Sequence, residues 1–143
     1  MFRLQRRHAE EIVAHAREAA PNECCGILAG KNGRALKLSR AVNAEESPYR
    51  YNIETQDLYR IHSEARAKGW EFVAIYHSHP DAEAYPSETD VALARWPGGD
   101  VYVDAWPGVR YLIVSLADAQ SPVIRAFRIE EGRVSEESLQ VVD

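Results

Sequence analysis

Two histidines separated by one residue stand at the end of an apolar segment of the chain. The segment runs from Trp70 to Tyr76 and continues as His77-Ser78-His79-Pro80. Successive side chains of a β-strand point to opposite faces, so His77 and His79 share a face and point at one place. A pair of imidazoles held in this way supplies two ligands for a metal ion.

A carboxylate on the next element offers a third ligand. Seven residues separate His79 from the segment Ser87-Glu88-Thr89-Asp90, and Asp90 is the candidate. Two neutral imidazoles and one carboxylate, with a fourth position left open, form a ligand set that suits catalytic zinc.

The segment around Asp90 also has a purely structural interpretation, as the start of a helix. Ser87 follows Pro86 and precedes the run Val91-Ala92-Leu93-Ala94-Arg95, so Ser87 would be the N-cap and Asp90 would lie in the first turn. The two interpretations are compatible, because a helix N-terminus holds a carboxylate in a fixed direction. We favour the metal site, because the helix start lies only a short loop from the strand end.

A zinc hydrolase also needs a group that moves protons, and Glu23 is the candidate. Zinc lowers the pKa of bound water from about 16 to about 7, but a nearby carboxylate is usually needed to transfer the proton. Glu23 stands at the head of a short apolar segment that ends at the turn Gly30-Lys31-Asn32-Gly33. Its position alone fits either a solvated strand-end residue or a catalytic one.

Together these residues resemble a known family. Glu23, followed by His77-x-His79-x7-Ser87-x-x-Asp90, matches the full motif of the JAMM (MPN+) metalloproteases in order and spacing. The resemblance implies a zinc ion held by His77, His79 and Asp90, with water as the fourth ligand. It also implies that Glu23 is the general base and that Ser87 hydrogen-bonds the oxyanion of the tetrahedral intermediate.

The resemblance runs from about Pro21 through Leu116 and also indicates a substrate class. Members of the family hydrolyse isopeptide or peptide bonds at the C-terminus of ubiquitin or a ubiquitin-like protein. The loops at Ala44–Ile53 and Pro97–Val109 are short, and the second lacks the Cys/His set of an auxiliary zinc site. The chain is therefore similar to the small prokaryotic members that act on ubiquitin-like sulfur-carrier proteins. We expect cleavage after a Gly-Gly tail, with release of cysteine, another amino acid or a conjugated protein.

The main alternative is a non-catalytic MPN scaffold for protein–protein assembly. Such domains typically lose metal ligands, whereas this chain keeps all three together with the acid and the serine. A zinc nucleobase deaminase, which has a loosely similar layered fold, needs His-x-Glu and Pro-Cys-x-x-Cys ligands. Cys24 and Cys25 are adjacent, so the sequence does not support a deaminase.

Composition sets further limits, and we expect one catalytic domain over residues 1–143. A chain of 143 residues with 45% hydrophobic and 27% charged residues is ordinary for one soluble globular domain. The net charge of −5 argues against nucleic-acid binding. The chain has neither a membrane-length apolar run nor the apolar region of a signal peptide, so we expect no membrane partner and a cytoplasmic location.

The remaining cysteine, histidine and aromatic side chains are expected to lie outside the metal-ligand set. Adjacent Cys24 and Cys25 are expected to be free thiols in a reducing compartment. Cys25 shares a face with Glu23 if both lie on a strand; we interpret it as a buried thiol, with a role near the metal as the alternative. The remaining histidines are expected at exposed helix positions: His8, His15 and His62. Five aromatic residues either line a groove for the Gly-Gly tail or anchor loops: Tyr49, Tyr51, Tyr85, Tyr102 and Trp106.

The elements that must position these residues form a mixed β-sheet layered with helices. This is the α/β architecture expected of the JAMM/MPN family, which is similar to that of the cytidine deaminases. Helices are expected over Leu4–Ala20, Thr55–Lys68 and Ser87–Trp96. Strands are expected over Glu23–Ala29, Ala35–Val42, Trp70–His79, Arg110–Leu116, Val123–Ile129 and Val134–Val141. The first two strands form a hairpin about Lys31-Asn32-Gly33, and Val101–Val103 is expected to lie in a loop between Pro97-Gly98-Gly99 and Trp106-Pro107-Gly108.

Overall fold

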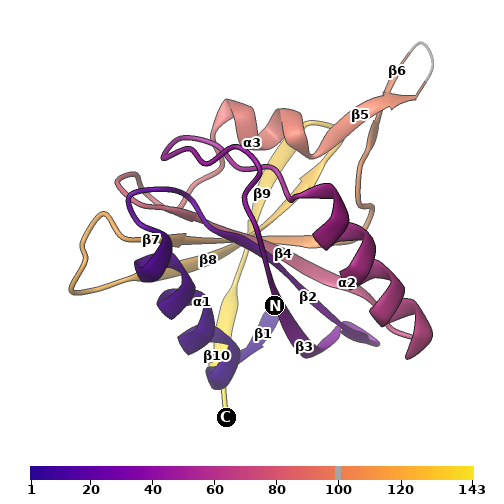
Figure 1. Cartoon of the computed structure of the whole chain (residues 1–143), viewed down its shortest axis with the longest axis horizontal. Helices are drawn as coiled ribbons and strands as arrows, with labels where there is room; N and C mark the ends of the chain where they lie inside the picture. The colour runs from indigo at the N-terminus through magenta and orange to yellow at the C-terminus, as the bar shows by residue number, and fades with distance from the viewer. Residues whose placement is uncertain (99–100) are drawn as a thin grey trace.

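A six-stranded mixed sheet forms the centre of the computed structural model, which describes residues 1–98 and 101–143 (Figure 1). The strand order is β3-β2-β4-β7-β8-β9. These strands are β2 (Cys25–Lys31), β3 (Arg34–Ala41), β4 (Glu71–His79), β7 (Arg110–Ser115), β8 (Val123–Glu130) and β9 (Arg133–Glu137). The predicted mixed sheet and the hairpin of the first two strands are thereby confirmed.

Strand β4 lies inside the sheet and carries the histidine pair at its end. It is antiparallel to β2 and parallel to β7, with His79 beside Ser115. Helices cover both faces of the sheet: α1 (Arg6–Ala19) packs on one, and α2 (Thr55–Ala67) and α3 (Glu88–Leu93) pack on the other. Every residue of β4 from Val73 to His79 is therefore buried.

The two faces of β4 belong to two apolar clusters. Tyr76 packs in the cluster that contains Ile12 of α1, and Ile75 packs in the cluster that contains Ile61 of α2. Burying one such side chain contributes roughly 1.5–3 kcal/mol, so β4 is strongly held in register. His77 and His79 inherit that rigid placement.

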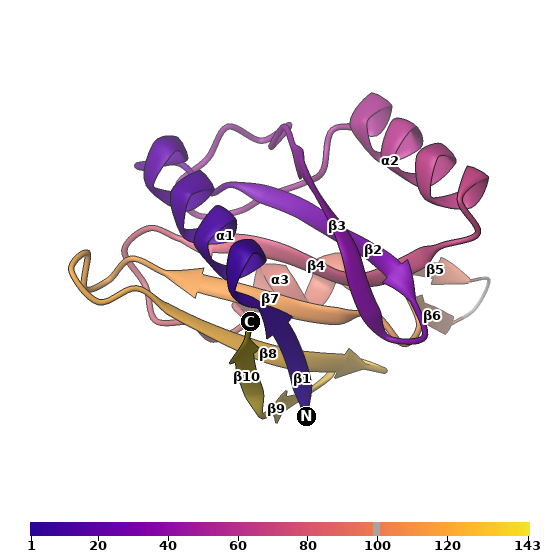
Figure 2. The ribbon, with the colours of Figure 1, turned by 90° about the horizontal axis from the view of Figure 1, so that it is seen from below.

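The two ends of the chain differ from the sequence-based expectation. The helix predicted from Leu4 begins at Arg6, because Phe2–Gln5 is a strand, β1, with Phe2 and Leu4 buried. The strand predicted over Val134–Val141 is interrupted, and its last part forms β10 (Leu139–Val142). Figure 2 shows β1 and β10 side by side, and they pair in parallel. Pairing between distant segments outweighed the helical pattern around Leu4.

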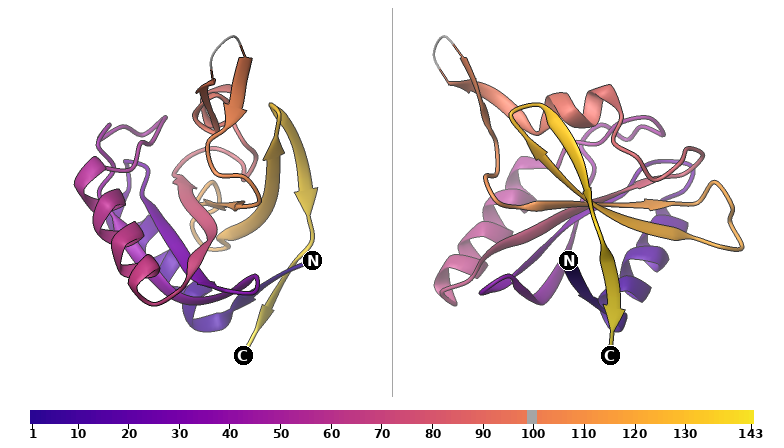
Figure 3. Two further views of the ribbon diagram at one scale, coloured as in Figure 1. Left: turned by 90° about the vertical axis from the view of Figure 1, so that its right-hand side faces the viewer. Right: turned by 180° about the vertical axis from the view of Figure 1, so that it is seen from behind.

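The segment after α3 also differs. The helix predicted over Ser87–Trp96 ends at Leu93, and the expected loop contains a hairpin of β5 (Arg95–Gly98) and β6 (Val101–Asp104). The hairpin projects from the body of the molecule (Figure 3). Cross-strand pairing stabilises residues that we predicted as loop. Gly99, part of the predicted turn, lies outside the described residues.

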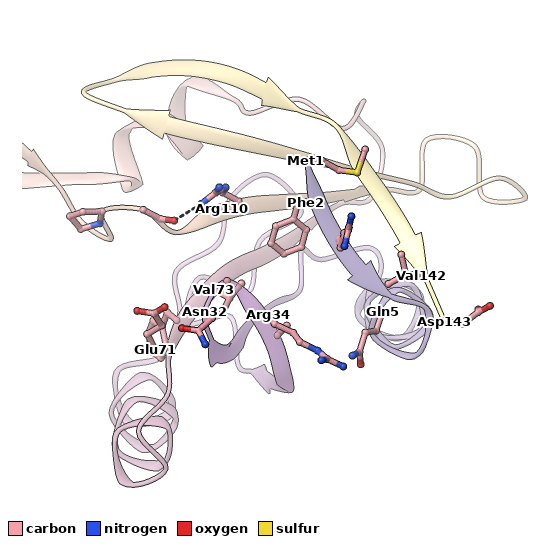
Figure 4. A pocket seen from close by; sticks show the side chains of 16 residues that line it. Met1, Phe2, Gln5, Asn32, Arg34, Glu71, Val73, Arg110, Val142 and Asp143 are labelled. Carbon is pink, nitrogen blue, oxygen red and sulfur yellow. Dashed lines mark hydrogen bonds between the residues drawn. The ribbon is translucent and has the colours of Figure 1, made fainter.

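A hollow of about 850 Å³ lies at the beginning of β4, whereas the histidines lie at its end. Phe2, Arg34, Glu71, Val73 and Arg110 are among its lining residues (Figure 4). Glu71 and His79 are eight positions apart along an extended strand, a span of about 25 Å. The hollow is therefore separate from the predicted chemistry. In the described part of the chain, no helix is long and apolar enough to cross a membrane.

Candidate metal centre

The three predicted metal ligands converge on one point. The Nε2 atoms of His77 and His79 lie 3.2 Å apart, and each lies 3.0 Å from Oδ2 of Asp90. All three residues are buried. Strand β4 supplies both imidazoles, and the first turn of α3 supplies the carboxylate.

The start of α3 fixes the direction of the Asp90 carboxylate. The Asp90 backbone N–H donates to Ser87 Oγ at 3.0 Å, and the Ser87 backbone N–H donates to Asp90 Oδ2 at 2.9 Å. This reciprocal pair is a capping box. The predicted N-cap is therefore correct, and the cap also aims Asp90 at the histidines.

A backbone carbonyl fixes the orientation of the His79 ring. Nδ1 of His79 lies 2.7 Å from the carbonyl oxygen of Glu83. A carbonyl only accepts, so Nδ1 carries the proton and Nε2 of the neutral ring carries the lone pair. Ser115 donates to the Ala82 carbonyl at 2.6 Å and thereby holds the loop that contains Glu83.

This proton arrangement fits a cation. The His79 Nε2 lone pair and the Asp90 carboxylate are both acceptors, yet they face each other at 3.0 Å. A proton or a cation must lie between them. Burial disfavours the charge of Asp90, but its hydrogen bonds with His77 and His79 outweigh that effect and hold its pKa well below the usual range. Two nitrogens and an ionised oxygen are donors that a divalent metal accepts.

Glu23 lies beside the metal ligands, as the strand register requires. Cys25 of β2 is opposite His77 of β4, and the backbone N–H of Ser78 donates to the carbonyl of Cys24 at 3.1 Å. Because the two strands are antiparallel, continuing the register by one more residue brings Glu23 to the level of His79.

The environment of the Glu23 carboxyl raises its pKa. Only 4% of the residue is exposed, and within the described structure Oε1 has no hydrogen-bond partner. Burial raises the pKa from 4.5 to about 8; the charge of His79 opposes the shift and that of Asp90 adds to it. Glu23 is therefore a buried carboxyl that titrates near neutral pH and not a solvated strand-end residue.

Tyr51 packs against the site through a ring stack that the sequence did not predict. We predicted a groove residue or a loop anchor. The residue is only 6% exposed, and its ring stacks on the His77 ring, with a centroid separation of 4.3 Å and an interplanar angle of 18°. The stack packs one side of the His77 imidazole, a candidate metal ligand.

The other aromatic residues have varied surroundings. Tyr49 and Tyr85 are exposed, at 81% and 46%, whereas Trp106 is partly buried and packs against Phe72. The side chain of Tyr102 lies outside the part of the structure that is described. Exposure of Tyr49 and Tyr85 is compatible with a groove and equally with ordinary surface positions.

One prediction about the remaining histidines is wrong. His8 is buried at 5% exposure, because it faces the core from the first turns of α1. His15 is partly buried, with Nδ1 2.7 Å from the Tyr76 hydroxyl, and His62 is exposed as expected. Both cysteines are buried free thiols, as predicted.

Comparison with known proteins now identifies the family. Residues 5–130 match the model of the prokaryotic homologues of the JAB domain, so the chain belongs to this family. The JAMM/MPN resemblance and the fold class predicted from the sequence are both confirmed.

Three similar proteins place the chain within the family. A CysO-cysteine peptidase from Mycobacterium tuberculosis is 39% identical over 134 residues, which cover 92% of this chain and 85% of that protein. A desampylase from Haloferax volcanii is 32% identical over 124 residues, or 76% of this chain and 89% of that protein. The solution structure of a protein from Desulfitobacterium hafniense superimposes with a TM-score of 0.83 at 32% identity, covering 100% of this chain and 94% of that one.

Proposed function

We propose that this chain is a zinc-dependent peptidase, with one catalytic domain, that hydrolyses the bond after the C-terminal Gly-Gly of a ubiquitin-like sulfur-carrier protein. The observation that carries the proposal is the convergence of His77, His79 and Asp90 beside the buried carboxyl of Glu23. A scaffold domain needs neither. The names of two relatives, a CysO-cysteine peptidase and a desampylase, support the substrate class.

Three atoms would hold the zinc ion: Nε2 of His77, Nε2 of His79 and Oδ2 of Asp90. When bound, zinc supplies Lewis-acid chemistry, polarising a carbonyl and lowering the pKa of water to about 7. The contacts around the ligands fix their geometry: the Glu83 carbonyl orients His79, and the capping box orients Asp90.

Glu23 holds and moves the proton. In the metal-free protein its pKa is raised to about 8, so the carboxyl takes up a proton more readily than an exposed glutamate does. Oε1 has no hydrogen-bond partner among the described residues and is available to water or substrate. We assign Glu23 as the general base toward the attacking water and as the acid that protonates the leaving amine.

Ser87 supplies a hydrogen-bond donor. A hydroxyl has one proton and two lone pairs, and Ser87 Oγ uses a lone pair to accept the Asp90 N–H. Its proton remains free to donate. We assign this O–H to the oxyanion that develops on the scissile carbonyl, a contact that typically contributes ~10²–10³-fold to turnover.

The burial of the site favours a Gly-Gly tail. Glu23, His77, His79 and Asp90 are each 5% exposed or less. A polypeptide that brings its carbonyl to such a recessed site needs a narrow end, and glycine lacks a Cβ. An extended tail would also gain affinity from main-chain hydrogen bonds.

The test is mass spectrometry of ubiquitin-like carriers that bear a C-terminal cysteine or a short peptide after Gly-Gly. The wild-type protein should release the extension, and a chelator should stop it. Glu23→Gln should lower turnover by ~10²–10⁴-fold while zinc stays bound. Replacement of the last carrier glycine by valine should block release. Near-wild-type turnover of Glu23→Gln, or equal cleavage of unrelated unstructured peptides, would contradict the proposal.

A further inference from the structure

One loop holds both backbone polar groups of Glu23. The Glu23 N–H donates to the Ser47 carbonyl at 2.8 Å, and the Glu23 carbonyl accepts from Nδ2 of Asn43 at 3.1 Å. Both partners belong to the segment between β3 and α2, residues 43–53, which we call the 43–53 loop. The position of the catalytic carboxyl therefore depends on this loop.

The Asn43 side chain is the centre of the loop. Nδ2 also donates to the Arg50 carbonyl at 3.1 Å, and Oδ1 accepts from the backbone N–H groups of Glu45 and Asn52, both at 3.0 Å. An asparagine amide offers two donors and two acceptor lone pairs. Asn43 uses all four, so no other residue type reproduces its contacts.

The same contacts place Tyr51. Arg50 and Asn52, the residues on either side of Tyr51, are the two that Asn43 binds through their backbone. Tyr51 is thereby directed inward, where its ring stacks on His77. One amide side chain thus connects the backbone of the general base to the ring that packs on a metal ligand.

We propose that Asn43 and Tyr51 are positioning residues: Asn43 sets the Glu23 carboxyl relative to the metal ligands, and Tyr51 fixes the His77 imidazole. This inference rests on the proposed function. Asn43 contacts Glu23 at its backbone carbonyl, and Tyr51 contacts the ring of His77, so we expect both to act through these residues. Contacts that orient ligands typically change metal affinity or activity by 10–100-fold when removed, which sets the size of the expected effects.

The Asn43 arm uses Asn43→Asp, a change of similar size that keeps the acceptors and removes both donors. Asn52→Asp is the matched control, because it adds the same charge to the same loop at an exposed side chain without a hydrogen bond in the described structure. Asn43→Asp should lower kcat ~10–100-fold with zinc affinity within ~2-fold of wild type. Amide exchange of Glu23 in the metal-free protein should accelerate. Asn52→Asp should match the wild type in kcat, in zinc affinity and in the exchange rate of the Glu23 amide.

The Tyr51 arm uses zinc affinity, measured by competition with a chromophoric chelator. Tyr51→Leu removes the stack, Tyr51→Phe keeps it, and Tyr59→Leu removes a tyrosine that is 75% exposed on α2. Tyr51→Leu should weaken zinc binding ~10–100-fold. Tyr51→Phe and Tyr59→Leu should bind zinc as the wild type does.

Contrary results are separable from a failure of the proposed function. Wild-type kcat in Asn43→Asp, despite faster exchange of the Glu23 amide, would reduce Asn43 to a loop contact and overturn its role. Unchanged zinc affinity in Tyr51→Leu would overturn the proposal that Tyr51 fixes the His77 imidazole. If the wild type cleaves no carrier, the proposed function fails, and zinc affinity and amide exchange still decide the two roles. In that case, exchange of the Glu23 amide in Asn43→Asp that is as slow as in the wild type overturns the positioning role of Asn43. Faster exchange supports that role.

Discussion

Backbone atoms largely determine which protons the candidate metal centre carries. The Glu83 carbonyl assigns the proton of His79 to Nδ1, and the Ser87 N–H stabilises the ionised Asp90. Glu23 has neither kind of support, and burial raises its pKa to about 8. The pKa values of these neighbouring carboxyl groups are thus shifted in opposite directions: that of Asp90 is lowered, which keeps it charged, and that of Glu23 is raised.

The raised pKa of Glu23 predicts how the stability of the metal-free protein depends on pH. The carboxyl has a pKa of 4.5 when exposed and about 8 when folded, so between these values the folded state binds more protons than the unfolded state. The free energy of unfolding should therefore be highest below about pH 4.5 for this group and fall as pH rises to 8. Glu23→Gln should remove this contribution. Urea unfolding of both proteins from pH 5 to 8 checks it; parallel pH curves would contradict the assignment.

At the residue scale, the sequence predicted which side chains converge but not the residues that hold them in place. Spacing alone placed His77, His79 and Asp90 together, because strand alternation and a helix cap are local rules. Tyr51 and Asn43 act through a loop that folds back over β4, and no local rule places a loop. An asparagine directly after a strand was the available signal for Asn43.

Among the elements, α3 begins at Ser87, for which we propose a second role besides capping. The Ser87 side chain caps the helix, and we propose that its hydroxyl also donates to the oxyanion. Replacing an N-cap serine by alanine costs about 1 kcal/mol, but replacing it by glycine costs only a few tenths. The two substitutions therefore separate capping from catalysis.

We predict that Ser87→Ala and Ser87→Gly lose turnover equally, by ~10²–10³-fold, because both lack the hydroxyl. Only Ser87→Ala should lose about 1 kcal/mol of unfolding free energy. Denaturant unfolding and single-turnover assays on the same samples measure both effects. If Ser87→Gly keeps most of the activity, Ser87 acts only as a cap.

Close packing between β2 and β4 supplies a second prediction for the elements. Gly26 lies against Tyr76, and a Cβ at position 26 would overlap the tyrosine ring. Gly26→Ala should destabilise the fold by about 1–3 kcal/mol, a typical cost of overpacking. Tyr76→Leu in the same chain should make the combined loss smaller than the sum of the single losses. Additive losses in thermal unfolding would show that the two residues are independent.

The differences between the predicted and the observed helices and strands have one physical cause. Strands β1, β5, β6 and β10 are each four residues long, and within the described residues each pairs with a single partner. Such short strands carry little periodicity, and their stability comes from the partner. Longer elements with two partners or a buried face, such as β4 and α2, were predicted to within a few residues.

For the whole molecule, the sheet brings together three segments that are far apart in the sequence. Glu23, the β4 histidines and Asp90 meet only when β2, β4 and α3 are packed, so the unfolded chain has no formed site. A metal that binds only the folded state stabilises it by about 2.7 kcal/mol at 100 times its dissociation constant. Zinc should therefore raise the Tm of the wild type by about 5–10 °C at that ratio.

His77→Ala and Asp90→Ala should show little of this rise, since each removes a ligand. Calorimetry with and without zinc measures it. An equal increase in the wild type and in both variants would place the zinc elsewhere on the chain.

Stepwise zinc titration of the metal-free protein, with turnover of a carrier–cysteine substrate measured at each point, tests the central claim most directly. The wild type should gain activity in proportion to bound zinc and reach a plateau at one zinc ion per chain. Glu23→Gln should bind the same one zinc ion and remain at least ~10²-fold less active throughout. Full turnover before any zinc is added, or a Glu23→Gln curve that follows the wild type, would contradict a zinc peptidase with Glu23 as its base.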